Sequence, residues 1–197
     1  MRQGLTLVTL VMTLFGGSDT VPNRPLVQSA KVGLALPLVL EKNEGEQRVR
    51  RPRNNPIASG PFILKIDPKN SSSSHLVLGT EEMAPGALIP RLKHLGQDEI
   101  LLIQTSTAHV WLGDQERDVH AGGVVFIPSG TWISLRNTGN EVLNLVFVFS
   151  EPGFDEYLRC TSVPKGQQVA TMTDDEFKEC QHKGHAVFQA TGPPISK

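Results

Sequence analysis

A histidine and a glutamate stand close together behind a proline–glycine turn, in the segment PGALIPRLKHLGQDE at residues 85–99. His94 precedes Glu99 by five positions. Imidazole and carboxylate groups are ligands that zinc, iron and manganese use in proteins. Two such groups hold an ion poorly, because a zinc site takes three or four protein ligands. The pair therefore indicates either a partial metal site or a hydrogen-bonded histidine and glutamate inside a polar pocket.

Another histidine is a candidate third ligand. His109 and Trp111 share one face of an expected strand, because side chains alternate along a strand. If that face is the interior, His109 approaches His94; if it is the exterior, His109 is a surface residue. Both alternatives remain open from the sequence. A further group of donors, CQHKGH at residues 180–185, is excluded as a zinc site if Cys180 forms a disulfide.

The elements that would position these residues are short strands. Apolar runs of four to eight residues alternate with turns rich in glycine, proline, asparagine and serine, which is typical of a β-sandwich or barrel. The expected strands cover residues 62–67, 75–79, 99–104, 108–112, 123–127, 132–135 and 142–149. One helix is expected outside them. Thr173 and Glu176 form a capping-box pattern, so the helix runs from there to about His182, and Gly184 ends it.

Two motifs of this chain resemble the cupin superfamily. The first motif is a glycine, five residues, His-x-His, three or four residues, Glu, six residues and a glycine. Here it starts at Gly86 and ends at Ser106. The second motif is a glycine, five residues, Pro-x-Gly, two residues, His, three residues and Asn. Here it runs from Gly122 through Pro128 and Gly130 to Asn137 with every spacing kept. The resemblance implies an all-β, double-stranded β-helix (jelly-roll) barrel, with the short C-terminal helix packed outside it.

The resemblance also implies a metal held by three histidines and one glutamate. Only His94 and Glu99 of these four positions carry a ligand in this sequence. Leu92 and Ile133 occupy the other two, and neither side chain has a donor atom. We therefore expect either no cofactor or one weakly bound divalent transition metal, namely iron, manganese or zinc. The expected pocket is edged by His94 and Glu99 and lined by Leu92, Trp132, Ile133 and His109.

The N-terminal residues indicate export. Arg2 precedes the uncharged run GLTLVTLVMTLFGG, which is short for a membrane span and fits a signal peptide over residues 1–18. An uncleaved anchor and a buried strand are the alternatives. Residues 19–58 carry a charge-dense stretch with a basic cluster and are expected to form a flexible, solvated arm. Residues 59–150 form the expected barrel and residues 151–197 the C-terminal segment. The expected localisation is secreted or periplasmic.

Two cysteines, Cys160 and Cys180, are expected to form one disulfide, since an even count is typical of exported chains; two buried thiols are the alternative. The net charge of −1 argues against nucleic acid as a partner, and no stable membrane insertion is expected after the signal is removed. The expected function is a barrel that binds a small molecule. The alternatives are a metal-dependent cupin enzyme of the dioxygenase, decarboxylase or isomerase type, and a structural protein that forms a homodimer.

Overall fold

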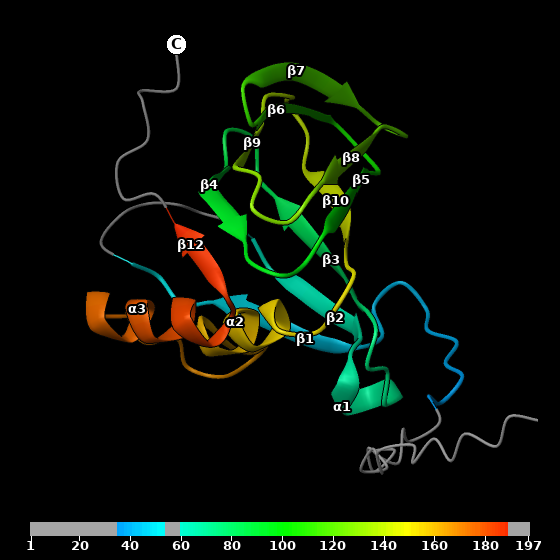
Figure 1. Cartoon of the computed structure of the whole chain (residues 1–197), viewed down its shortest axis with the longest axis vertical. Coiled ribbons are helices and arrows are strands. Elements are labelled where there is room, and N and C mark those ends of the chain that lie inside the picture. Colours follow the sequence, from blue (N-terminus) through cyan, green and yellow to red (C-terminus); the bar gives the residue numbers. More distant parts are fainter. Residues whose placement is uncertain (1–34, 54–59, 189–197) are drawn as a thin grey trace, which may run out of the picture. The chain divides into compact units, whose positions relative to one another are not determined.

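The computed structural model describes residues 35–53 and 60–188, and within them two antiparallel sheets face each other across one core. In Figure 1 the colours of the strands follow the sequence, from β1 in blue to β12 in red. The seven-stranded sheet has the order β11 (Ser162–Pro164), β1 (Glu46–Arg50), β2 (Phe62–Ile66), β3 (Val77–Met83), β10 (Leu143–Phe149), β5 (Glu99–Ile103) and β8 (Val124–Ile127). The five-stranded sheet has the order β12 (Ala186–Phe188), β4 (Leu88–His94), β9 (Ile133–Asn137), β6 (Thr107–Leu112) and β7 (Gln115–His120). This architecture confirms the jelly-roll barrel expected from the sequence.

The core forms between the sheets because side chains alternate along the strands. Every second residue of β3, β5 and β10 is buried, and the residues between them are partly or fully exposed. The buried set on β10 is Leu143, Leu145, Phe147 and Phe149. Phe147 lies directly over Gly79 of β3, where an added Cβ would come within 2.3 Å of the Phe147 ring. A glycine is therefore required on β3 for Phe147 to fill the interior.

The motif residues that match the family pattern build the turns around the strands. Gly122 and Gly130 have φ of 87° and 78°, a region that favours glycine. Asn137 is fully buried, and its amide donates to the carbonyls of Met83 and Glu141. Ser106 stands where the motif has glycine and still adopts the left-handed conformation, with φ of 66°. Its hydroxyl donates to Oδ1 of Asn137 at 3.0 Å, which offsets part of the strain.

The C-terminal segment adds two longer helices, α2 (Phe154–Cys160) and α3 (Asp174–Lys183), and a short helix, α1 (Pro68–Ser71), follows β2. Figure 1 shows α2 and α3 beside each other, close to β1 and β12. The Cys160–Cys180 disulfide joins α2 to α3, as the sequence indicated. Thr173 caps α3, and its capping box with Glu176 is formed in both directions, which confirms the expected helix.

The expectation of a solvated arm over residues 19–58 is wrong for residues 46–50. These residues form β1, which pairs with both β2 and β11 inside the larger sheet. The sequence EQRVR lacks apolar alternation, but its charged side chains find partners in the fold. Arg48 is 8% exposed and donates to the Ser162 hydroxyl and carbonyl. Most of the basic cluster is therefore tied to the C-terminal segment. The rest of the predicted arm that the structure does not describe is residues 19–34 and 54–58.

The seven expected strands are all present, with ends shifted by up to four residues. The sequence did not indicate β4, β7, β11 and β12, nor α2. β4 contains Pro90, and β7 carries the polar sequence QERDVH, so neither shows an apolar run. In the described part of the chain, no helix is long and apolar enough to cross a membrane. The predicted signal peptide, residues 1–18, lies outside the described residues.

Candidate functional site: an aromatic cavity at one end of the barrel

The histidine and glutamate singled out in the sequence meet inside the barrel. His94 is the last residue of β4 and Glu99 the first of β5, so the turn between the strands brings them together. The backbone of that turn is held by Gly130, whose N–H donates to the His94 carbonyl at 2.8 Å. Nε2 of His94 lies 3.1 Å from Oε2 of Glu99. The side chains are 2% and 10% exposed, so the pair is shielded from solvent.

The imidazole of His94 is enclosed by two aromatic rings. The centre of the Phe149 ring lies 5.0 Å from the centre of the imidazole, and that of the Phe154 ring lies 4.4 Å from it. Both pairs pack edge to face. Phe149 comes from β10 and Phe154 from the first turn of α2. The second ring nitrogen of His94, Nδ1, is buried, and among the described residues it has no hydrogen-bond partner. A buried polar atom without a partner costs stability, so its presence requires an explanation.

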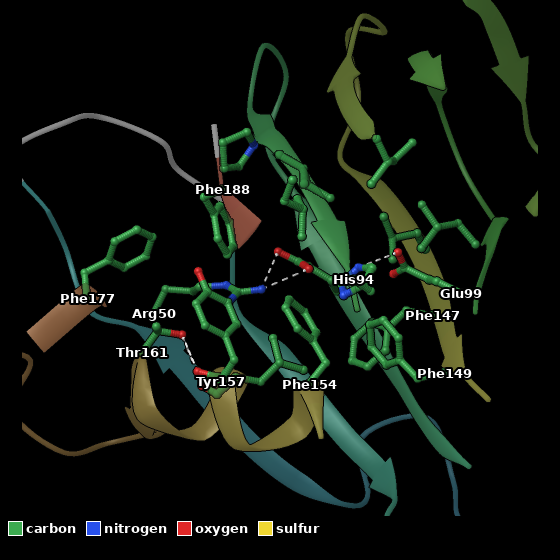
Figure 2. A pocket seen from close by; sticks show the side chains of 18 of the residues that line it. Arg50, His94, Glu99, Phe147, Phe149, Phe154, Tyr157, Thr161, Phe177 and Phe188 are labelled. Carbon is green, nitrogen blue, oxygen red and sulfur yellow. Dashed lines mark hydrogen bonds and ion pairs between the residues drawn. The ribbon is translucent and has the colours of Figure 1, made fainter. Parts of the chain in front are cut away.

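A cavity of about 110 Å³ opens beside this pair (Figure 2). Strands from both sheets form its inner wall, and α2, α3 and β12 form the rest. The wall includes Leu92, Leu101, Ile133, Leu145, Phe147, Phe149, Phe154, Tyr157, Leu158, Phe177 and Phe188. The larger part of the wall is thus aliphatic and aromatic, and the rest is polar, including His94, Glu99, Glu81 and arginines.

The side of the cavity nearer the C-terminal helices is a chain of aromatic rings. Phe154 stacks on Tyr157 at 4.8 Å, and Tyr157 contacts Phe188 at 5.1 Å. Phe188 in turn meets Phe177 of α3 at 5.4 Å. Burial raises the pKa of Tyr157 to about 12, so its hydroxyl stays protonated at neutral pH. The sequence analysis missed this half of the cavity, although four aromatic residues within 35 positions of one segment are a detectable signal.

Arginines from β1 and the residues after it reach the same cavity. Nη2 of Arg50 lies 3.3 Å from Oε2 of Glu81, and the Arg50 guanidinium lies 4.7 Å from the centre of the Phe62 ring. Arg51 pairs with Glu176 and Arg53 with Asp174, both at the start of α3. These pairs connect β1 to α3 across the cavity, and each arginine has an acidic partner.

The family comparison agrees with this geometry. A family model of the cupin domain matches residues 79–149, which include both motifs and the turn between His94 and Glu99. Residues 79–149 of this chain are thus a cupin domain. A search of curated protein sequences found no match.

Several solved structures are similar to part of this chain. A predicted oxalate decarboxylase from Thermotoga maritima superposes with a TM-score of 0.50 at 21% identity and covers 58% of this chain and 100% of its own. The cupin domain of Schizosaccharomyces pombe Cnp3 gives 0.42 at 21% identity, covering 47% of this chain. A Bacillus halodurans protein gives 0.39 at 27% identity, covering 40%. The present cupin spans 64% of each of these last two chains, less than two thirds of their length.

The metal that the cupin motif implies does not fit the residues of this barrel. Leu92 and Ile133 stand opposite each other on β4 and β9, and they are 4% and 2% exposed. Both line the cavity next to His94, where the motif places histidine. In the described part of the chain, no three His, Cys, Asp or Glu side chains gather as a metal site would need. One histidine and one glutamate beside two apolar side chains leave an ion without enough ligands.

Two of the expected pocket residues lie elsewhere in this cupin. Along β6, Ala108 and Val110 face the core, so His109 points outward. Its Nδ1 lies 2.7 Å from Oδ1 of Asp118 on β7. His109 is therefore not a third ligand beside His94. Trp132 also lies outside the cavity lining, with the Lys93 ammonium 4.9 Å from its ring. The predictions that His109 and Trp132 line the pocket are therefore wrong: strand alternation turns His109 to the outer face of β6, and Trp132 precedes β9 and does not line the cavity.

Proposed function

We propose that this cupin is an exported binding protein whose barrel takes up a small, largely apolar organic molecule. The observation that carries the proposal is the cavity beside His94, whose wall is aromatic and aliphatic. An engineered apolar cavity of about 150 Å³ is sufficient to bind benzene. The present cavity is of similar size, at about 110 Å³, and its wall supplies dispersion contacts on several sides. This supports a ligand of about one ring.

The presence of a few polar groups in an apolar wall is typical of binding sites for small molecules. Apolar walls supply affinity and a few fixed polar groups supply orientation. Here the buried pair of His94 and Glu99 and the ion pair of Arg50 and Glu81 lie in the same lining. Arg51 and Arg53 also line it, and a core evolved for stability alone has little reason to keep six such groups around an open space.

Toluene is a suitable first probe, because it offers one ring and no strong hydrogen-bonding group. We expect saturable binding by calorimetry or by ligand-observed nuclear magnetic resonance. Leu145→Phe should fill the cavity and weaken binding by about tenfold or more. Leu143→Phe is the matched control. Leu143 lies two residues away on the same strand and is equally buried, but it does not line the cavity.

The control separates loss of the cavity from general damage to the core. Both variants add the same volume to one strand and both are expected to cost about 1–3 kcal/mol of stability. If Leu143→Phe weakens toluene binding as much as Leu145→Phe, binding does not occur in the cavity. Absence of binding to the parent protein, for toluene and for other single-ring compounds, would refute the proposed function.

The export part of the proposal rests on the N-terminal pattern and is supported by the Cys160–Cys180 disulfide. Intact-mass analysis of protein from its native host tests it. The proposal predicts a chain that lacks about the first 18 residues of the sequence. Recovery of the full-length chain inside the cell would contradict export and would leave the cavity proposal unaffected.

A further inference from the structure

Three side chains that line the cavity, His94, Arg50 and Arg53, carry a buried polar atom without a partner among the described residues, and on His94 that atom belongs to an imidazole rather than a guanidinium. Nδ1 of His94 is buried and has no donor or acceptor among the described residues. The His94 side chain is only 2% exposed and lines the cavity. Figure 2 shows the ring lying between Glu99 and Phe154. A ligand in the cavity is therefore the natural source of the missing hydrogen-bond partner.

The other ring nitrogen decides what kind of partner Nδ1 needs. Nε2 lies 3.1 Å from Oε2 of Glu99, and an ionised carboxylate can only accept a hydrogen bond. Opposite an ionised Glu99, Nε2 carries the hydrogen. If the imidazole is neutral, the remaining nitrogen is then a lone-pair acceptor. In this charge state of the pair, Nδ1 can accept a hydrogen bond.

The aromatic neighbours prevent the ring from turning away. Phe149 and Phe154 hold the imidazole from two sides, with interplanar angles of 63° and 87°. Such edge-to-face packing fixes the ring plane. Neither phenylalanine can supply a conventional hydrogen-bond donor, so these two rings leave Nδ1 unpaired.

We infer that the ligand of this cavity is a single-ring molecule with an O–H or N–H group. This group donates a hydrogen bond to Nδ1 of His94. This inference rests on the proposed function and names the class of ligand. In this protein the histidine of the cupin motif would act as a hydrogen-bond acceptor that recognises an organic donor. The two apolar residues, Leu92 and Ile133, would make room for the ring on the side where the motif places further ligands.

Pyrrole and pyridine test the inference as a pair. Both are single flat rings of similar size, but pyrrole has an N–H donor and pyridine has only an acceptor nitrogen. Calorimetric titration at neutral pH should show pyrrole binding about tenfold more tightly than pyridine, because pyridine would leave Nδ1 unpaired. In the His94→Leu variant this preference for pyrrole should disappear. The two dissociation constants should then differ only as much as the hydrophobicities of pyrrole and pyridine differ.

Glu99→Gln is the more conservative variant and separates a recognition role from a structural one. The glutamine amide can donate to Nε2, which allows the hydrogen to move to Nδ1. The preference for pyrrole should then shrink or reverse while toluene binding remains. This variant also keeps the test open if His94→Leu fails to fold.

The outcomes distinguish the two proposals. If pyrrole, pyridine and toluene all fail to bind, the proposed function is refuted and the inference falls with it. If toluene binds but pyrrole and pyridine bind equally well, the cavity stands and the inference is wrong. A preference for pyridine in the parent protein would also overturn it, because Nδ1 would then be a donor.

Discussion

Two buried polar clusters of this protein differ in how completely they are satisfied. At the base of α2, the Arg159 guanidinium contacts Glu46, Asp67 and Asp155. The Asp67 and Asp155 side chains are 1% and 4% exposed, and each shares a charge-assisted hydrogen bond with the arginine. In the cavity, His94 has one partner, Glu99, and a ring nitrogen that no other described residue pairs with. The first cluster is complete without a ligand, whereas the second lacks a group that a ligand can supply.

The charges of the first cluster shift the pKa of its members. Burial alone would raise the pKa of Glu46, but hydrogen bonds and charges from Arg159 and then Arg48 outweigh it and lower the pKa. Burial would lower the pKa of Arg159, yet Glu46 and Asp67 raise it overall. The cluster therefore favours the charged forms of Glu46 and Arg159. It connects β1, the N-terminus of α1, and α2. Its role is to hold the C-terminal segment against the barrel.

The largest expected effect is the loss of Arg159. Arg159→Met removes the partner of two buried aspartates, which should lower the free energy of unfolding by about 3–5 kcal/mol. Urea denaturation measures it. Arg117→Met on the exposed face of β7 is the control and should change stability by no more than about 0.5 kcal/mol. If the two variants behave alike, the Arg159 cluster does not hold the fold together.

The disulfide should rank next. Its cysteines are 20 residues apart, and it fastens α2 to α3, which carry part of the aromatic wall. Cys160→Ala combined with Cys180→Ala should lower the free energy of unfolding by about 3 kcal/mol in the chain-entropy picture. Added reductant should destabilise the parent by a similar amount and leave the double variant unchanged. A parent insensitive to complete reduction would contradict this.

The Glu46 carboxyl should make the first cluster sensitive to acid. Because its folded pKa is lowered, its stabilising contribution is present above the unfolded pKa of about 4.3 and is lost as the pH falls through the folded pKa. Glu46→Gln should therefore be less stable than the parent at neutral pH, and the difference should shrink below about pH 4. Thermal unfolding across pH 3–7 measures it, with exposed Glu151→Gln as control. A difference that is constant with pH would exclude this ionic contribution.

The smallest effect on stability is expected in the cavity. Replacing both members of the pair, His94→Leu with Glu99→Leu, removes one hydrogen bond and the unpartnered nitrogen together, so stability should change by less than about 1.5 kcal/mol. The single His94→Leu variant should be less stable than the double, because Glu99 is left buried without its partner. Guanidinium unfolding compares them. A double variant as damaged as Arg159→Met would make the pair a structural element.

The barrel was predictable from local pattern, whereas the site was only half predictable. Strand alternation and the turn glycines mark β5, β8, β9 and β10, and the motif spacing brings His94 to Glu99. The side chain of His109 was misplaced because the face of a short strand depends on which neighbours are buried, as Ala108 and Val110 are on β6. Trp132 was expected on a strand, but β9 begins only at Ile133. The choice between the two faces is made by tertiary packing.

The remaining half of the cavity depends on long-range contacts that no local pattern records. Arg50 belongs to a strand without apolar alternation, and it reaches the cavity only because β1 pairs with β2 and β11. Tyr157 lies on a seven-residue helix whose first residue is preceded by Gly153 without a side-chain cap. Charge pairing and aromatic packing with distant residues decide both positions.

The central claim is that Leu92 and Ile133 have turned a cupin metal position into an apolar ligand cavity. Calorimetric titration with Mn²⁺ of the parent and of the variant Leu92→His with Ile133→His tests it most directly. Leu92 on β4 and Ile133 on β9 are paired across the two strands. The variant should therefore regain three histidines and one glutamate around one point. We predict one tight Mn²⁺ site and a higher melting temperature with Mn²⁺ for the variant, and neither for the parent. One equivalent bound tightly by the parent would contradict the account.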